Sequence, residues 1–172
     1  MSKKTRVITL SALFSALSFI SLYFASVWPT GRYGLVAFSS LFVAGAVCEA
    51  GIASGVYVFI VGSALGMLLL PDKSAPVLYV LFFGYYPVLK SLIERVRRAY
   101  LQWILKLLVF NAAFMVLWFL AGALVFGSGD YPSGIFPILI IGLNLVFALF
   151  DYGFSKVIRF YVDSVSKYTG RN

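Results

Sequence analysis

The sequence of 172 residues contains no histidine, a single cysteine and only six acidic residues. Without histidine, imidazole catalysis and histidine-based metal sites are excluded, and the lone Cys48 excludes an internal disulfide framework. No glycine-rich loop ends in Gly-Lys-Ser or Gly-Lys-Thr, so the usual motif for ATP hydrolysis is absent. No nucleophile, base and orienting group form a recognisable set, and no apolar segment carries paired carboxylates. We therefore predict a non-enzymatic protein that uses no metal and no cofactor.

Charge is scarce and apolar residues are abundant. Hydrophobic residues make up 62% of the chain and charged residues 12%, whereas soluble domains are roughly half apolar and about a quarter charged. A soluble protein of this size could not bury so much apolar surface, because its surface area is too large relative to its volume. These proportions predict an all-α integral membrane protein in which residues 1–172 form a single transmembrane domain.

A transmembrane helix needs about 20 mostly apolar residues, and the apolar segments fit six of them. The first is too long for a signal-peptide core, and no small-residue cleavage motif follows it. The polar step at Glu49 and Gly51 divides one long apolar block, which leaves the second span short and therefore tilted, irregular or re-entrant. Pro87 predicts a kink within the fourth span. The six predicted spans are 7–28, 35–47, 51–70, 77–93, 107–126 and 135–152, with loops at 71–76 and 127–134.

The distribution of basic residues predicts the orientation of this six-helix bundle. If the N-terminus is cytoplasmic, twelve of the fourteen Lys and Arg residues face the cytoplasm. They lie at the N-terminus, in the segment 90–106 and in a basic, amphipathic tail at 153–172, as the positive-inside rule requires. We therefore predict a multi-pass protein of the cell's inner (plasma) membrane with both termini cytoplasmic. Anionic lipid explains the net charge of +8 without any nucleic-acid partner.

Two cations face outward in this topology and form a candidate binding site for a small solute. Arg32 and Lys73 are the only basic residues outside, and Tyr33 follows the first of them directly. A small anionic or zwitterionic solute would suit this set. Solvated charges and an interfacial aromatic belt are the alternative interpretation. Other residues predicted on the outer side are Trp28, Asp72, Asp130 and Tyr131.

Polar residues inside the spans form a second candidate set, because such groups are costly in hydrocarbon. Tyr85 and Tyr86 lie on the fourth span, Asn111 on the fifth and Asn144 on the sixth. They could converge on a bound solute. The interpretation we favour is that the asparagines bond to neighbouring helices and the tyrosines fill interfaces. Asp151, at the end of the sixth span, is expected to meet a cytoplasmic cation such as Arg97 or Lys156.

Two further patterns concern contacts between helices or between proteins. Gly51, Gly55, Gly62 and Gly66 place small residues four apart on the third span, which favours close packing inside the bundle over contact with another chain. In the segment 90–106, Glu94 is spaced to pair with Arg98 on a helix. That segment is expected along the inner interface, either as a topological anchor or as a docking surface for a cytoplasmic partner.

The opening Lys3-Lys4-Thr5-Arg6, followed by Ala12-Leu13-Phe14-Ser15-Ala16, resembles the first helix of an S component of energy-coupling factor importers. The chain is also similar to that family in size, span number and the cytoplasmic placement of both termini. The resemblance implies a subunit that captures a vitamin-like micronutrient from outside, with the loop after the first span as part of a lid. It also implies docking through Ala12 and Ala16 onto a membrane coupling protein served by separate ATPase subunits.

A second class of protein also fits the size and the number of predicted spans of this chain. Small membrane scaffolds, such as the rod-shape-determining membrane proteins of the bacterial envelope, share this size and span number. Such a protein would bind other proteins through the segment 90–106 and the tail. A self-contained transporter built from two halves is less favoured, because residues 7–70 and 77–152 show no convincing similarity.

Overall fold

The computed structural model describes residues 3–28, 30–125 and 136–169. Within those ranges the regular secondary structure is entirely helical, and six segments are long and apolar enough to cross a membrane: Lys4–Val27, Arg32–Ala50, Ile52–Leu69, Ser74–Ile93, Ala99–Phe119 and Pro137–Ser164. The prediction of an all-α chain with six potential membrane-spanning helices is therefore confirmed. The predicted loop at 127–134, with Asp130 and Tyr131, lies outside the described residues.

The first three helices are α1 (Lys3–Val27), α2 (Arg32–Ala50) and α3 (Ile52–Leu69). The expectation that the second span is short is wrong. Helix α2 has 19 residues and extends about 28 Å at roughly 1.5 Å per residue. Glu49 stays within α2, which ends at Ala50. The next residue, Gly51, has a φ of 90°, in the region that favours glycine. The break between the second and third spans is thus where the sequence predicted it.

The fourth span is an interrupted helix made of α4 (Ser74–Leu78), a π-helical turn η1 (Tyr79–Phe83) and α5 (Tyr86–Ile93). The Gly84 N–H donates to the Tyr79 carbonyl over 2.7 Å, which closes the wider turn. The N–H groups of Val88 and Leu89 both donate to the Tyr85 carbonyl, so the helix restarts there. Pro87 lies in the first turn of α5, where its missing N–H is tolerated. The irregularity that Pro87 predicted is therefore present, immediately before the proline.

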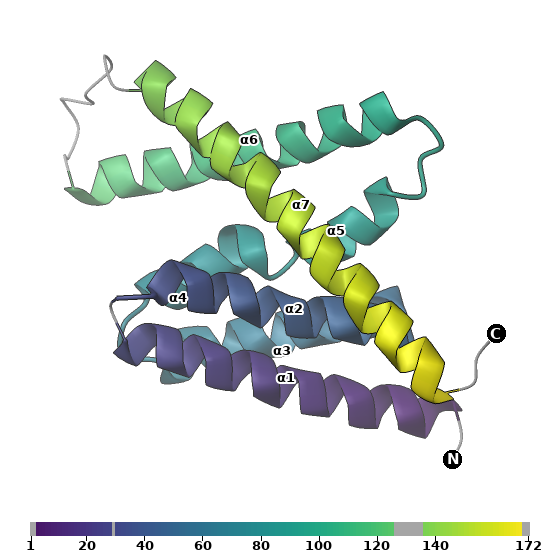
Figure 1. The fold of residues 1–172 in the computed structure, drawn as a ribbon. Helices are drawn as coiled ribbons and strands as arrows, with labels where there is room; N and C mark the ends of the chain where they lie inside the picture. The colour runs from purple at the N-terminus through teal and green to yellow at the C-terminus, as the bar shows by residue number, and fades with distance from the viewer. Residues whose placement is uncertain (1–2, 29, 126–135, 170–172) are drawn as a thin grey trace. The chain divides into compact units, whose positions relative to one another are not determined.

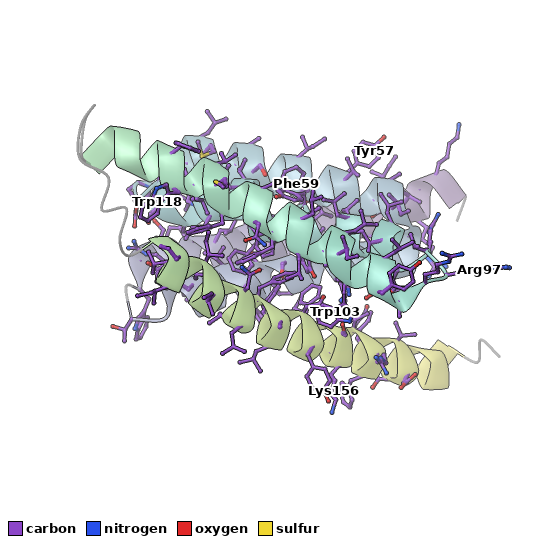
Figure 2. All side chains as sticks on the ribbon, turned by 90° about the horizontal axis from the view of Figure 1, so that it is seen from above. Tyr57, Phe59, Arg97, Trp103, Trp118 and Lys156 are labelled. Carbon is purple, nitrogen blue, oxygen red and sulfur yellow. The ribbon has the colours of Figure 1, made fainter. Side chains whose placement is uncertain are left out.

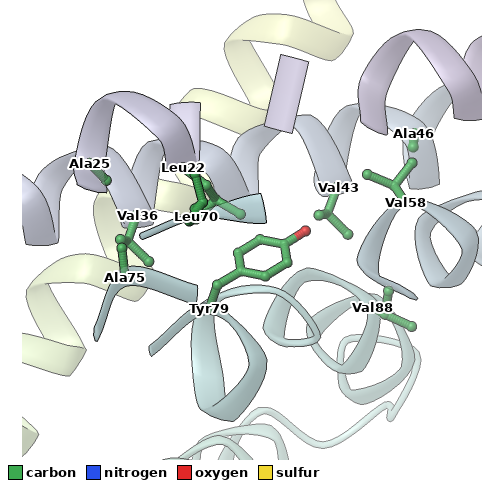
Figure 3. Close-up of a cluster of buried hydrophobic side chains, with 10 residues drawn as sticks. All are labelled: Leu22, Ala25, Val36, Val43, Ala46, Val58, Leu70, Ala75, Tyr79 and Val88. Carbon is green, nitrogen blue, oxygen red and sulfur yellow. The ribbon is translucent and has the colours of Figure 1, made fainter. Parts of the chain in front are cut away.

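The chain divides into two compact units, which are described separately. Unit 1 comprises the described residues of 1–95 and 158–172, and unit 2 comprises those of 96–157. In unit 1, α1, α2 and α3 pack side by side (Figure 1). The ring of Tyr79 lies among the apolar side chains of their core (Figure 3). The fully buried members of that core include Leu22, Val36, Val43, Val58 and Tyr79.

Helix α1 turns a stripe of serines toward this core. Ser11 shares a 2.7 Å hydrogen bond with Ser54 on α3, and Ser18 donates to the Tyr79 hydroxyl over 3.1 Å. Ser21 donates to the Leu35 carbonyl on α2 over 2.9 Å. Serines are small enough to let helices approach closely, and their hydroxyls bond across the interface. This stripe fixes which face of α1 is buried.

The glycines of α3 face the same core. Gly55, Gly62 and Gly66 are buried. A Cβ atom on Gly62 would lie 3.1 Å from the Tyr79 hydroxyl oxygen, and one on Gly66 would lie 3.1 Å from Cβ of Pro76. These positions require glycine because neighbouring helices approach the α3 backbone closely. Packing inside the chain, the interpretation that the sequence favoured, accounts for all three.

Unit 2 is built on α6 (Ala99–Val125) and the part of α7 (Phe136–Thr169) up to residue 157. The rings of Phe110 on α6 and Phe147 on α7 stack with centroids 4.5 Å apart. Helix α6 begins eight residues before the predicted start at 107, because Ala99–Lys106 contains no glycine or proline to end a helix. The second half of the basic segment 90–106 is therefore part of a helix that is long and apolar enough to cross a membrane. Likewise, the predicted tail continues α7 as far as Thr169.

Candidate functional sites

The outer candidate site contains Arg32, which joins the start of α2 to the loop before α4. Its guanidinium lies 2.6 Å from the Asp72 carboxylate and donates to the Ser74 hydroxyl over 2.7 Å. The backbone N–H of Ser74 donates to Asp72 over 2.9 Å. These bonds and the Arg32 guanidinium hold the pKa of the Asp72 carboxyl below its ordinary value of 3.8. The Arg32 charge is thus compensated locally.

Lys73, the other outward cation of the prediction, caps a helix. Its ammonium donates to the carbonyls of Met67 over 2.7 Å and Leu70 over 2.6 Å, at the end of α3. The last carbonyls of a helix have no partners within the helix and carry a partial negative charge, so a lysine there is stabilising. Tyr33 is exposed on α2. Arg32 and Lys73 therefore make intramolecular contacts instead of forming an open pair of cations.

Tyr85 and Tyr86, predicted as possible ligand contacts, take part in aromatic packing. Tyr86 is fully buried, and its ring centroid lies 4.9 Å from that of Phe82. Tyr85 is half-buried and meets Phe59 edge-on at 6.1 Å. Edge-to-face and offset rings at such distances are favourable packing arrangements. Both tyrosines thus fill an interface around η1, in line with the favoured interpretation.

Asn111 on α6 and Asn144 on α7 bind each other. The Asn111 amide nitrogen donates to the Asn144 amide oxygen over 2.9 Å, and the reverse bond spans 3.1 Å. Each amide nitrogen also donates to the carbonyl four residues earlier in its own helix, that of Leu107 or Ile140. Because an amide has two N–H donors, every donor of the pair is used. The structure therefore gives these asparagines the interhelical role that we favoured.

Lys106 and Asp151 form a buried ion pair that the sequence did not anticipate. Their charged atoms lie 2.9 Å apart, and the residues are only 5% and 2% exposed. The sequence had suggested Arg97 or Lys156 for Asp151, whereas the Lys156 ammonium lies over the Tyr152 ring at 5.0 Å. The predicted fifth span began at residue 107. Lys106 was therefore expected in the basic segment along the inner membrane interface. The signal in the sequence was the unbroken helix-forming run from Ala99.

Lys90 on α5 and the turn between α5 and α6 carry the remaining basic residues of the segment 90–106. Lys90 is buried and pairs with Glu94 over 2.9 Å. Glu94 was expected to pair with Arg98, but α5 ends at Ile93, so these residues do not share a helix. The Arg98 guanidinium donates to the Tyr100 hydroxyl over 2.8 Å. The Glu94–Arg98 pair therefore lacks the continuous helix on which the prediction relied.

At the opposite end of unit 1 from the Arg32 cluster, Glu49 binds two residues distant in sequence. The Arg6 guanidinium on α1 lies 3.4 Å from one carboxylate oxygen, and the Tyr161 hydroxyl on α7 donates to the other over 3.4 Å. These contacts bring the start of α1, the end of α2 and residue 161 together. Cys48, next to Glu49, is exposed.

Ala12 and Ala16, the predicted docking residues, are both exposed on α1. Because the serine stripe occupies the buried face, the alanines lie on the other face of the helix.

Among the described residues, no group of three or more histidine, cysteine, aspartate or glutamate side chains could hold a metal ion. No protein-family model, curated protein or solved structure matches the chain significantly.

Proposed function

We propose that the chain is a multi-pass protein of the inner (plasma) membrane that captures a small micronutrient outside and passes it to an importer. It catalyses no reaction. It docks through the face of α1 that carries Ala12 and Ala16 onto a membrane coupling protein, and separate ATPase subunits drive transport. This is the arrangement that the resemblance to energy-coupling factor S components implies.

The observation that carries the proposal is the division of α1 into two faces. Ser11, Ser18 and Ser21 bond to α2, α3 and Tyr79, so the serine face is occupied. Ala12 and Ala16 are exposed on the other face. Small side chains let a helix from another membrane protein approach the α1 backbone. The surface needed for docking is therefore available on the helix where the resemblance requires it.

The contacts of Glu49 support cytoplasmic placement of both termini. Arg6, near the start of the chain, and Tyr161, near its end, both bind Glu49 at the inner end of α2. A chain with both ends on one side must cross the membrane an even number of times, which agrees with six spans. The basic residues near these ends favour the cytoplasmic side.

The solute would bind at the outer ends of the unit 1 helices. Arg32 and Lys73 lie there, but each already bonds within the protein. A negatively charged solute would have to replace Asp72 at Arg32, so the proposal does not depend on these cations. Tyr33 and Trp28 are exposed near the same helix ends and could stack on an apolar or aromatic part of the solute.

Native mass spectrometry of protein purified gently from its own host tests this proposal. The expected result is a retained metabolite together with coupling and ATPase subunits. In Ala12→Trp/Ala16→Trp, the subunits should be lost and the metabolite kept, because bulky side chains prevent close helix contact. The matched control is Ile60→Trp, another exposed apolar position in unit 1, which should keep both. An empty protein accompanied by envelope or cytoskeletal proteins would instead identify a scaffold.

The single cysteine allows the topology to be tested without engineering. Cys48 is exposed at the predicted cytoplasmic end of α2. A membrane-impermeant maleimide should label it in inverted membrane vesicles and leave it unmodified in intact cells or right-side-out vesicles. Labelling with the opposite preference would overturn the proposed orientation while leaving the six-span architecture intact.

A further inference from the structure

The turn between α5 and α6 concentrates positive charge. Arg95, Arg97 and Arg98 occur within four residues and are all exposed. The Arg97 side chain points away from the helices of unit 2 (Figure 2). The carboxylate nearest in sequence, Glu94, is held by Lys90 over 2.9 Å. The first turn of α6 contains no acidic residue, so an anion is the complementary partner for this turn.

An exposed apolar surface begins at the same place. Tyr100, Ile104 and Leu108 follow one another at four-residue intervals on α6 and are 56%, 54% and 61% exposed. Residues four apart lie on the same side of a helix, so these three make a continuous line. The Tyr100 hydroxyl accepts a 2.8 Å hydrogen bond from Arg98. This bond places the Arg98 guanidinium beside Tyr100, the first residue of the apolar line.

We propose that Arg97 and Arg98, with Tyr100, bind the phosphate headgroup of an anionic phospholipid, whose acyl chains lie along Ile104 and Leu108. Guanidinium groups bind phosphate through paired, charge-assisted hydrogen bonds. Tyrosine and tryptophan settle at the level of lipid headgroups, and Tyr100 and the half-exposed Trp103 both lie on the first turns of α6. The adjoining apolar line distinguishes a lipid from free phosphate, because soluble phosphate has nothing to place there.

This inference rests on the membrane location in the proposed function and is independent of transport. Trp103 is a local reporter once Trp28 and Trp118 are replaced by phenylalanine. The protein would be placed in nanodiscs containing brominated phosphatidylglycerol or brominated phosphatidylcholine, and the quenching of Trp103 fluorescence would be measured. The expected result is stronger quenching by the anionic lipid, and thus a higher relative affinity for it near Trp103.

The variant Arg97→Gln/Arg98→Gln should lose this preference, by roughly fivefold in relative affinity for each arginine removed. Arg97→Lys/Arg98→Lys should keep most of it, because the charge remains. The matched control, Lys4→Gln/Arg159→Gln, removes the same charge from exposed positions of unit 1 and should leave the preference unchanged. Circular dichroism and size-exclusion chromatography would verify that each variant is folded.

Several outcomes would overturn the inference. The first is equal quenching of Trp103 by the two lipids in the protein with both arginines present. The second is an equal loss of the preference for anionic lipid in the Lys4→Gln/Arg159→Gln control. The third is loss of that preference when inorganic phosphate replaces chloride at the same ionic strength. The last result would identify a site for free phosphate. If neither brominated lipid quenched Trp103, the membrane location itself would be wrong, so failure of the inference and failure of the proposed function are distinguishable.

Discussion

The ammonium group of Lys106 on α6 lies 2.9 Å from the carboxylate of Asp151 on α7, and both residues are almost fully buried. Phe110 lies four residues after Lys106, Phe147 lies four residues before Asp151, and their rings stack. Beyond them, Asn111 and Asn144 exchange two hydrogen bonds. Polar groups in hydrocarbon are costly unless paired. The ion pair, the stacked rings and the asparagine pair therefore determine how α6 and α7 align within unit 2.

Replacing one partner of the ion pair should strongly destabilise unit 2. Asp151→Asn leaves the Lys106 charge buried beside a neutral amide, and breaking a buried pair in this way costs about 3–5 kcal/mol. Denaturant-induced unfolding in mixed micelles would measure the change in the free energy of unfolding. Lys106→Met/Asp151→Leu should recover most of the loss, because neither charge remains. Lys156→Gln, at an exposed position, is the control and should change stability by less than about 0.5 kcal/mol. Wild-type stability in Asp151→Asn would contradict a structural role for the pair.

The asparagine pair should show coupling in a double-mutant cycle. Asn111→Leu and Asn144→Leu each leave one amide facing an apolar side chain, while the double variant removes both amides. Interhelical hydrogen bonds in membrane proteins couple by about 0.6 kcal/mol on average and up to about 1.7 kcal/mol. We expect a coupling energy in this range from unfolding measurements. Val116→Ala, at an exposed position of α6 on a different face from Asn111, should show no coupling to Asn144→Leu. Additive effects of the two asparagine substitutions would indicate that their mutual bonds contribute nothing.

Gly84 should not tolerate a methyl group. A Cβ atom there would lie 2.6 Å from Cδ2 of Phe59 and 2.8 Å from Cε1 of Tyr79. Gly84→Ala should therefore displace packed rings and reduce stability by about 1–3 kcal/mol. The control is Gly142→Ala on α7, where a Cβ would have no neighbouring atom within 4 Å. That variant should be neutral or slightly stabilising, because alanine favours helix. Thermal unfolding of both variants measures the difference, and equal melting temperatures would contradict the packing around η1.

The contribution of Asp72 should depend on pH. The folded state lowers the pKa of its carboxyl below the ordinary 3.8, so the folded protein binds the proton less readily than the unfolded chain. The resulting stabilisation is fully present above that ordinary value and is lost as the pH falls through the lowered folded-state pKa. The melting temperature of wild type should thus exceed that of Asp72→Asn at neutral pH, and the gap should close in strong acid. A gap that stayed constant across this range would show that the charge of Asp72 contributes no stability.

The outer cluster of Arg32, Asp72 and Lys73 could be predicted from the sequence only in part. Arg32 and Lys73 were predicted to face outward because topology depends on the distribution of charge along the chain. Their partners could not be deduced in the same way. Asp72 meets Arg32 only because the loop before α4 folds back to the start of α2, and Lys73 reaches the end of α3 through two backbone carbonyls.

The sequence alone determined that this chain is helical, that six segments are long and apolar enough to span a membrane, and that a break follows Glu49 at Gly51. These properties are local, because hydropathy and the backbone freedom of glycine act over a single segment. The tertiary structure decided the pairing of Lys106 with Asp151, the mutual bonding of the two asparagines and the exposure of Ala12 and Ala16. Those relationships depend on which helix faces meet, and helix faces are selected by packing between residues far apart in the chain.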